Sequence, residues 1–397
     1  MGCILSLGSD RVQNAPQRTR FIGGMAGVVL AWSLVVFASG CEDDPPAEPI
    51  RLTIETHPPG ASVVLDGERL PGFTPLSLDS LAAGDHELLM HLVGFADTLH
   101  SIALGADSNP HIAIALRAIY GVVLSIGSSG SGIGEFNAPF DVAVDGEGSI
   151  YVSDQLNHRI QVFDSHFEYA STFGTRGTGP GQFINPAGLH FDGGELFVVD
   201  SFNDRIQVFS PIGAYRREWP IPRIDQAPNP IDLTLLPSGH ILVTDFVNQR
   251  VFEFSREGAY LGTWLPRDPA EDRSLFGISS AMDMVLVGDR KRDSVRRYNL
   301  DGTDAGPWRF SGSGSMLNPG CISQNAAGIV AIPESEKNRV MFYDSHDGSV
   351  FYEAGEGSDL GPLHHPVGAA WSSGQLLVVT DLSMDRIVII RPEARRS

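Results

Sequence analysis

Asp154-Gln-Leu-Asn157-His-Arg159-Ile160 is the first and clearest copy of a phrase that recurs along this chain. Close copies begin at Asp200 and Asp245, and degraded copies begin at Asp289, Glu334 and Asp381. Successive acidic positions lie 46, 45, 44, 45 and 47 residues apart. A nearly fixed period of this size indicates one supersecondary unit repeated six times, as in a propeller or another repeat array.

Each unit has the pattern of four short strands. In the first unit, apolar or β-branched runs cover 139–144, 149–153, 159–163 and 167–173, and Gly, Asn or Asp separates them. This pattern predicts an antiparallel meander, and no part of the repeat region has helical spacing. A lone four-stranded sheet has two apolar faces that it cannot bury. We therefore expect an all-β protein in which six sheets pack face to face around an axis.

The last unit lacks its fourth strand. It runs over 366–371, 375–380 and 386–390, and the chain ends at Ser397. A spare apolar run, Tyr120-Gly-Val-Val-Leu-Ser-Ile-Gly127, precedes the first unit. We predict that residues 119–126 form the outer strand of the last sheet and so close the ring, which removes an open sheet edge.

The units resemble NHL repeats over roughly residues 118–391. The resemblance rests on Gly134-Glu-Phe136-Asn-x-Pro139, on Gly181-Gln-Phe183-Ile-Asn185-Pro186, and on the repeated Asp-x-x-Asn-x-Arg-Ile phrase. It is strongest in the first two units and weakest in the fourth. It implies a six-bladed β-propeller. Most members of this family are recognition surfaces for protein, nucleic acid or carbohydrate, and a minority are metal-dependent lyases.

The Asp and Arg of the phrase are expected to be structural. They lie five residues apart across the link between the second and third strands, where a carboxylate–guanidinium pair would hold the hairpin. The expected pairs are Asp154 with Arg159, Asp200 with Arg205, and Asp245 with Arg250. A ring of ligand contacts is the alternative, but a catalytic group should be singular, whereas these residues recur.

A smaller domain precedes the repeats. Residues 50–116 contain Pro59-Gly60-Ala61, the turn Asp66-Gly67, and Gly72-Phe-Thr74-Pro75. They resemble a PEGA domain, which implies a small β-sandwich. The propeller is then expected over 117–392, and 393–397 form a short tail. His86, His91, His100 and His111 fall on separate predicted strands without metal-ligand spacing, so no metal or cofactor is assigned there.

The front of the chain has the pattern of an export signal. Residues 1–40 carry three Arg and then a long apolar run, and Ala38-Ser39-Gly40-Cys41 follows. This junction resembles a bacterial lipobox, which implies cleavage before Cys41 and lipid on that residue. An uncleaved signal anchor is the alternative. Residues 41–49 form an acidic, Pro-rich spacer. Both readings predict a location outside the cytoplasm in the cell envelope, and lipidation favours the outer membrane or cell surface.

Charge argues against nucleic acid as a partner. The formal net charge is −20, and it becomes −22 once three Arg and one Asp of the leader are removed. Such a field repels phosphate backbones, and the sequence contains no basic stripe. After cleavage Cys41 and Cys321 are the remaining cysteines, and lipidation of the first leaves no pair for a disulfide. Cys321 is expected to be a small buried residue.

Candidate ligand residues come from the innermost strands and the loops before them. Most innermost positions carry small residues that suit crowding at the axis, but Asp141, His190 and Asp232 do not, so we expect them at the central channel. Polar loop residues should face the same rim. The ligand-binding candidates are Asp141, Asn185, His190, Asn229, Asp232, Arg273, Asn318, His364 and His365.

Three functions are compatible with the sequence. The first is a recognition module whose rim binds an envelope protein, peptide or glycan. The second is a lyase or hydrolase that uses a metal held by His190, His365 and Asp141 or Asp232. The third is a structural spacer. The first is favoured, because only His190 and the pair His364–His365 occupy suitable positions, too few for a three-His metal site. No catalytic residue is assigned.

Overall fold

The computed structural model describes residues 50–392 with internal gaps. The gaps are 58–60, 92–95, 106–108, 117–120, 265–272, 282, 309–315, 317, 346–347, 356–362 and 373–374. The predicted leader at 1–40, the lipidation site Cys41, the spacer at 41–49 and the tail at 393–397 therefore lie outside the described residues. Within the described part, no helix has the length and apolarity needed to span a bilayer.

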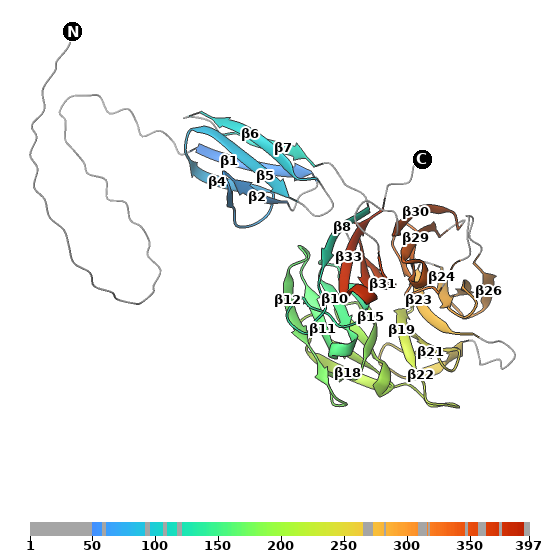
Figure 1. Ribbon diagram of the computed structural model, residues 1–397. Helices are drawn as coiled ribbons and strands as arrows, with labels where there is room; N and C mark the ends of the chain where they lie inside the picture. The colour runs from blue at the N-terminus through green and yellow to red at the C-terminus, as the bar shows by residue number, and fades with distance from the viewer. Residues whose placement is uncertain are drawn as a thin grey trace, which may run out of the picture. The chain divides into compact units, whose positions relative to one another are not determined.

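Two small sheets form the N-terminal domain (Figure 1). One has the order β4-β1-β7, with β7 parallel to β1, and the other has the order β3-β2-β5-β6. Alternate residues of β1 are buried, including Leu52 and Ile54, and they pack with Val63, Leu88 and Met90 of the second sheet. The strands are β1 (Ile50–His57), β2 (Ser62–Leu65), β3 (Glu68–Arg69), β4 (Leu76–Leu81), β5 (Gly84–His91), β6 (Thr98–Leu104) and β7 (His111–Ala115).

Six further four-stranded sheets follow, here numbered blade 1 to blade 6 in chain order (Figure 1). Blades 1 to 3 are regular antiparallel meanders in which consecutive strands pair. Blade 1 is β9 (Pro139–Val144), β10 (Ile150–Asp154), β11 (Arg159–Phe163) and β12 (Tyr169–Phe173); blade 2 is β15 (Pro186–Asp192), β16 (Glu195–Asp200), β17 (Arg205–Phe209) and β18 (Tyr215–Pro220); blade 3 is β19 (Pro230–Leu235), β20 (Ile241–Asp245), β21 (Arg250–Phe254) and β22 (Tyr260–Trp264).

Blades 4 and 5 keep the same order, although the innermost strand of blade 5 is only two residues long. Two short parallel strands, β13 (Thr175–Arg176) and β14 (Gln182–Phe183), lie in the loop between blades 1 and 2. Blade 4 is β23 (Leu275–Ala281), β24 (Met284–Asp289), β25 (Ser294–Asn299) and β26 (Asp304–Pro307); blade 5 is β27 (Ser323–Gln324), β28 (Ile329–Glu334), β29 (Arg339–Asp344) and β30 (Val350–Gly355).

Blade 6 takes its outer strand from the other end of the repeat region. Its own strands are β31 (Pro366–Trp371), β32 (Leu377–Asp381) and β33 (Arg386–Arg391). The fourth strand is β8 (Gly121–Ile126), which pairs antiparallel with β33, for example at Ile387 opposite Ile126. The described part of the predicted segment, Gly121–Ile126, thus pairs with β33, and closure of the ring by this pairing stays a prediction.

Burial on both faces explains why the sheets stack. All five residues of β10 are buried. Val152 packs in a cluster with Val378 of blade 6, whereas its neighbour Tyr151 packs with Leu196 of blade 2. Because successive strand residues point to opposite faces, each middle strand contributes to two cores. The prediction of an all-β chain with a small sheet domain followed by a propeller is confirmed, and there is no α-helix among the described residues.

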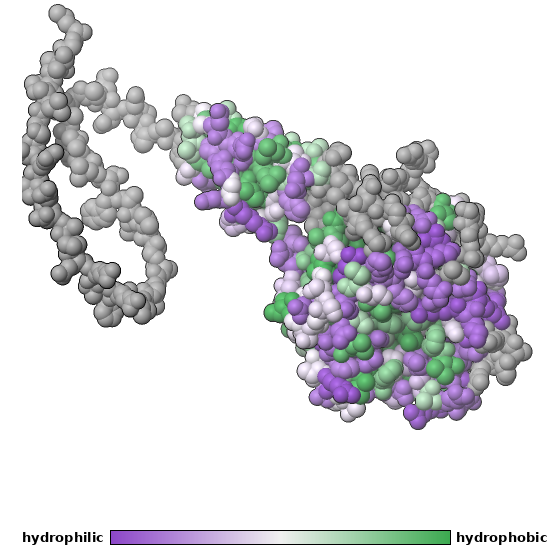
Figure 2. Space-filling model, viewed as in Figure 1, coloured by the Kyte–Doolittle hydropathy of each residue, from purple (hydrophilic) through white to green (hydrophobic). Residues whose placement is uncertain are grey.

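The second and third strands of four blades are linked by one turn of 3₁₀ helix. Each turn ends at a residue with left-handed backbone, such as His158 with φ 55°. The turns are η1 (Gln155–Asn157), η2 (Ser201–Asn203), η3 (Ser335–Lys337) and η4 (Leu382–Met384). On the face shown in Figure 2, hydrophilic residues predominate and hydrophobic patches lie among them.

Candidate functional site

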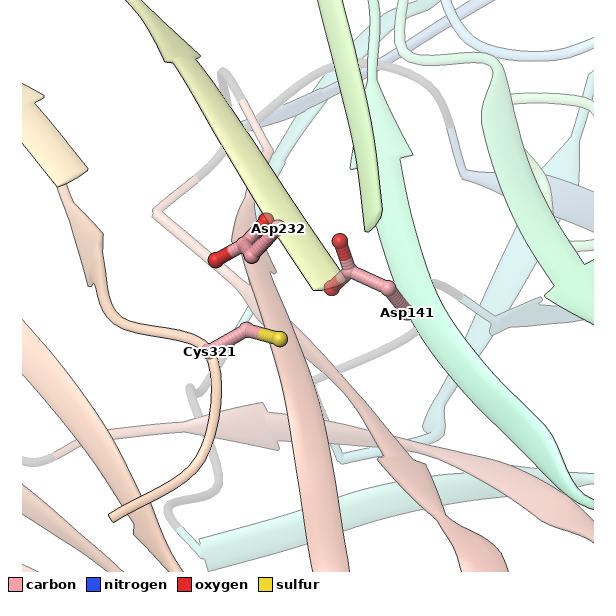
Figure 3. A group of neighbouring side chains, drawn as sticks. All are labelled: Asp141, Asp232 and Cys321. Atoms are coloured by element: carbon pink, nitrogen blue, oxygen red, sulfur yellow. The ribbon is translucent and has the colours of Figure 1, made fainter. Parts of the chain in front are cut away.

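One repeat position, within the innermost strand of five blades and just before it in blade 5, alternates around the axis between an Asp or Cys side chain and glycine. Blades 1, 3 and 5 carry Asp141, Asp232 and Cys321, which point toward one another from separate segments (Figure 3). The equivalent residues of blades 2, 4 and 6 are Gly188, Gly277 and Gly368.

The alternation follows from the width of the axis. A Cβ at Gly188 would lie 2.6 Å from Cα of Asp232, and a Cβ at Gly368 would lie 2.6 Å from Cα of Asp141. At Gly277 it would lie 2.1 Å from the carbonyl oxygen of Gly320. Contacts this short cannot be made without moving backbone. Side chains therefore fit in only three of the six blades at this level.

The two axial carboxylates join neighbouring blades. Oδ2 of Asp141 accepts a hydrogen bond from the backbone N–H of Leu189, at 2.8 Å, in blade 2. Oδ2 of Asp232 accepts one from Ile278, at 2.9 Å, in blade 4. The Cys321 sulfur lies within 4.8 Å of a carboxylate oxygen of each Asp. Because both Asp residues are only 3% exposed, these contacts replace water and hold the inner strands together.

Burial governs the proton affinity of the axial groups. Desolvation, together with the nearby Asp232 carboxylate, raises the pKa of Asp141 well above its ordinary value. Desolvation also raises the pKa of Asp232 to about 7. It raises the pKa of the Cys321 thiol as well, so that group stays protonated at neutral pH. The cluster can therefore retain protons that solvent-exposed carboxyl groups would lose.

A cavity of about 220 Å³ lies beside this cluster. Its lining includes Asp141, Asp232 and Cys321 together with His190 and Trp371. Burial lowers the pKa of His190 to about 4, so the imidazole is neutral at pH 7. The structure thus places the three residues predicted at the central channel, Asp141, His190 and Asp232, around one space.

In the described part of the chain, few potential metal-binding side chains lie close together. Among the described residues, Asp141, Asp232 and Cys321 are the group whose potential ligand atoms all lie within 4.8 Å of one another. His190 lines the same cavity, but His365 does not. The combination of His190, His365 and an Asp that the sequence offered for a metal enzyme is therefore not assembled, because His365 lies in the loop before β31.

The repeated phrase ties each turn to the loop before its blade. In blade 2, Oδ2 of the fully buried Asp200 accepts from Nε of Arg205 at 2.8 Å, from Nδ2 of Asn203 at 2.8 Å and from Nε2 of Gln207 at 3.0 Å. The guanidinium of Arg205 also donates to the carbonyl of Gln182. The same set recurs in blade 1, where Arg159 donates to Asp154 at 2.7 Å.

Blade 3 departs from the expected pairing. Arg250 lies directly opposite Asp245, but its guanidinium donates at 2.6 Å to Asp225 in the loop before β19. Asp245 accepts instead from Nδ2 of Asn248 and from the N–H of Asn229. The loop before β19 offers Arg250 the Asp225 carboxylate. In blades 1 and 2 the corresponding guanidinium groups donate to loop carbonyls instead, those of Gly132 and Gly179.

Several rim candidates occupy a strained turn position. Each of these candidates directly precedes a proline: they are Asn185, Asn318 and His365, with φ of 55°, 52° and 63°. The N–H of Asn185 donates to Nδ1 of His158, and the N–H of His365 donates to Oδ1 of Asn338. These residues therefore link each blade to the preceding one through their backbone N–H groups, and their side chains are half-buried.

The other rim candidates lie on the same loops. Oδ1 of Asn229 accepts from Oγ of Ser201 at 3.2 Å, which joins blades 2 and 3. The N–H of His364 donates to Asp381 at 2.7 Å. Arg273 precedes β23 and is half-buried. The axial candidates and the rim candidates are thus two separate groups, one enclosed and one partly exposed.

Sequence reasoning missed the association of Cys321 with the two carboxylates. The signal was present, since Cys321 occupies the same repeat position as Asp141 and Asp232. It was also missed that Gln161 and Gln207 complete the shell around Asp154 and Asp200. The shared Arg-Ile-Gln-Val-Phe strand of blades 1 and 2 would have identified them.

Comparisons with known protein families agree with this architecture. Residues 50–119 match the PEGA domain, residues 144–223 match a family described as a 6-bladed beta-propeller, and residues 228–254 match the NHL repeat. Both resemblances inferred from the sequence are confirmed by these matches.

Curated relatives match parts of the propeller. The chain is 32% identical over 89 residues to the Protein brain tumor of Drosophila melanogaster, covering 22% of this chain and 9% of that protein. It is 30% identical over 123 residues to mouse NHL repeat-containing protein 3, covering 29% of this chain and 35% of the relative. The chain thus spans about a third or less of the length of these relatives.

Solved structures share the fold at low identity. A gluconolactonase from Xanthomonas campestris has a TM-score of 0.52 at 12% identity, covering 69% of this chain and 97% of that one. A catalytically inactive virginiamycin B lyase from Staphylococcus aureus, solved with quinupristin, has a TM-score of 0.50 at 12% identity, covering 87% and 99%. At such identities the likeness concerns the fold alone.

Proposed function

We propose that this chain is a membrane-anchored, extracytoplasmic binding or scaffold protein whose propeller rim recognises a protein, peptide or glycan of the cell envelope. The observation that carries the proposal is the contrast between axis and rim. The axial carboxylates are buried and engaged in interblade hydrogen bonds, whereas the rim loops present partly exposed polar side chains from several blades. The NHL match supports a propeller used as a protein-binding scaffold.

The anchor is proposed from the sequence. Cleavage before Cys41 would leave an acylated N-terminus, and several acyl chains give firm membrane attachment. Mass spectrometry of the protein purified from membranes tests this step. We expect an N-terminal peptide that begins at a lipid-modified Cys41. Recovery of an intact segment 1–40 would contradict lipidation.

The rim is tested with the full chain on a glycan array and in a pull-down from an envelope extract. Asn185→Gly removes the side chain but preserves the left-handed backbone, because glycine favours positive φ. Together with Asn229→Ala and His364→Ala, it should reduce ligand capture while the melting curve stays near that of the wild type. Unchanged capture by all three variants would refute recognition through these residues.

One observation favours a second function, that of a metal-dependent lyase or hydrolase. Asp141, Asp232 and Cys321 converge within 4.8 Å beside a cavity of about 220 Å³. Elemental analysis of the purified chain separates the two functions. Stoichiometric zinc or calcium that is lost in Asp232→Asn or His190→Ala would favour the enzyme. A metal-free protein that captures its ligand would favour the binding module.

A further inference from the structure

Exposed apolar side chains occupy one position of the repeated phrase in three consecutive blades. Leu156, Phe202 and Val247 each lie two residues after the acidic residue of the phrase and are 47%, 63% and 46% exposed. A single exposed apolar residue needs no explanation, but exposed apolar residues at one repeat position of three consecutive blades suggest an interaction site.

These three residues lie on one rim. The N–H of Leu156 donates to the carbonyl of Asn137, and the N–H of Phe202 donates to that of Ile184. In blade 3 the N–H of Phe246, next to Val247, donates to the carbonyl of Asn229. Each turn is thus fixed to the loop that precedes the innermost strand of its own blade.

At this repeat position the apolar residues occupy three of the six blades, although Met384, one residue further along in the turn of blade 6, is also 46% exposed. The equivalent residues of blades 4, 5 and 6 are Lys291, Glu336 and Ser383, which are exposed and polar. On the first half, Ile224 in the loop between blades 2 and 3 is a further exposed apolar residue, at 49%. We call Leu156, Phe202, Ile224 and Val247 the apolar arc.

Positive charge accompanies the apolar arc, although the chain as a whole is strongly acidic. Arg176, in the loop between blades 1 and 2, is exposed, and within the part of the chain that the structure describes it forms no ion pair. Its charge acts on His158, in the turn that carries Leu156. The carboxylates near Phe202 and Ile224 are engaged: Asp204 with Arg223 at 3.3 Å and Asp225 with Arg250 at 2.6 Å.

We propose that the apolar arc and Arg176 form a docking surface for a peptide segment that presents two or more apolar side chains and a carboxylate. This inference rests on the proposed rim-binding function and names its ligand class as peptide rather than glycan. The net charge of −20 does not oppose it. Screening reduces charge interactions beyond about 8–10 Å at physiological ionic strength, so the charges in direct contact decide the preference.

The test uses a phage library of random 12-residue peptides, selected on the full chain. We expect the enriched peptides to combine aromatic or aliphatic residues with Asp or Glu. One enriched peptide, made synthetically with a fluorophore, is then titrated by anisotropy. The triple variant Leu156→Ser, Phe202→Ser, Val247→Ser should weaken binding by at least about tenfold. Arg176→Glu should weaken binding severalfold at low salt, and this effect should shrink at 1 M NaCl.

Ile212→Ser is the matched control, because Ile212 is 85% exposed but lies in the turn between β17 and β18. It should bind like the wild type. The mutated side chains are exposed, so melting curves should coincide. Failure to enrich any peptide, or equal affinity of the triple variant, would overturn the docking surface. If the glycan array or the envelope extract still gave a rim ligand sensitive to Asn229→Ala, the proposed function would stand without this inference.

Discussion

The buried Asp232 should make the propeller less stable as pH rises, which is the opposite of the usual effect of an aspartate. Its pKa is raised to about 7 in the folded chain by burial, whereas in the unfolded chain it is near 3.9. Between these values the folded state binds more protons than the unfolded state, so this group's contribution to stability falls as pH rises from about 4 to 7. Asn does not titrate, so we expect Asp232→Asn to remove this loss. The unfolding free energy of the variant relative to the wild type should therefore rise between pH 4 and pH 7, by on the order of 1–3 kcal/mol.

Denaturant unfolding of both proteins at pH 4, 5.5 and 7 measures this difference. The stability of the variant relative to the wild type should increase with pH. Parallel curves over the whole range would show that Asp232 titrates normally and that burial does not raise its pKa.

Gly368 is required for steric reasons. A Cβ there would meet Asp141 at 2.6 Å, so we expect Gly368→Ala to destabilise the chain by about 1–3 kcal/mol or more. Gly146 is the control, since a Cβ at that position has no neighbour within 4 Å. Thermal unfolding compares the two variants. Equal melting temperatures for Gly368→Ala and the wild type would contradict the crowding of the axis.

For individual residues, the sequence predicted the place of a residue in the repeat better than it predicted the side chains that this residue contacts. Asp141, His190 and Asp232 could be placed at the channel because each has a fixed place in the repeat. The contact between Cys321 and both carboxylates could not, because it depends on how closely alternate blades approach the axis. The partner of Arg250 could not be predicted from the sequence either, since Asp225 lies in a loop outside the repeated phrase.

Each 3₁₀ turn is held by one buried carboxylate and one arginine. Removing Arg205 would leave Asp200, which is fully buried, without its charged partner. Breaking a buried pair in this way costs about 3–5 kcal/mol. We therefore expect Arg205→Ala to lower the midpoint of urea unfolding strongly.

Arg216 provides the comparison at the same scale, because its pair with Glu195 is partly exposed. Exposed pairs contribute about 0–1 kcal/mol, so Arg216→Ala should unfold close to the wild type. A similar small effect for both variants would mean that the phrase is not structural.

The strands themselves were largely predictable, since short apolar runs between Gly, Asn and Asp mark them in every blade. Two elements were not. The innermost strand of blade 5 is reduced to Ser323–Gln324, although the sequence around Cys321 matches the other blades in position. The pair β13 and β14 consists of two residues each, too short to leave a periodic pattern.

For the whole molecule, the pairing of β8 with β33 decides whether the ends of the propeller are joined. Without β8, the buried Ile387 and Ile389 would lose their outer neighbour and β33 would become an open edge. We expect deletion of residues 117–127 to lower the melting temperature sharply. An unchanged melting curve would refute closure by this strand.

The period of the repeat was sufficient to predict the architecture, because only a few arrangements bury both faces of six small sheets. It was not sufficient to predict a ligand. A repeated residue supports the scaffold. Some features differ between blades, such as the restriction of the apolar arc to blades 1–3, and these can be interpreted only once the structure places the turns on one rim.

The glycine alternation at the axis also limits how such a protein can be rebuilt. Blades with an axial side chain must stand next to blades with glycine, so the structural repeat is a pair of blades. Exchanging two adjacent blades would bring two bulky residues together at one place and leave a gap at another. Engineered or evolutionary rearrangements of this ring should therefore proceed by two blades at a time.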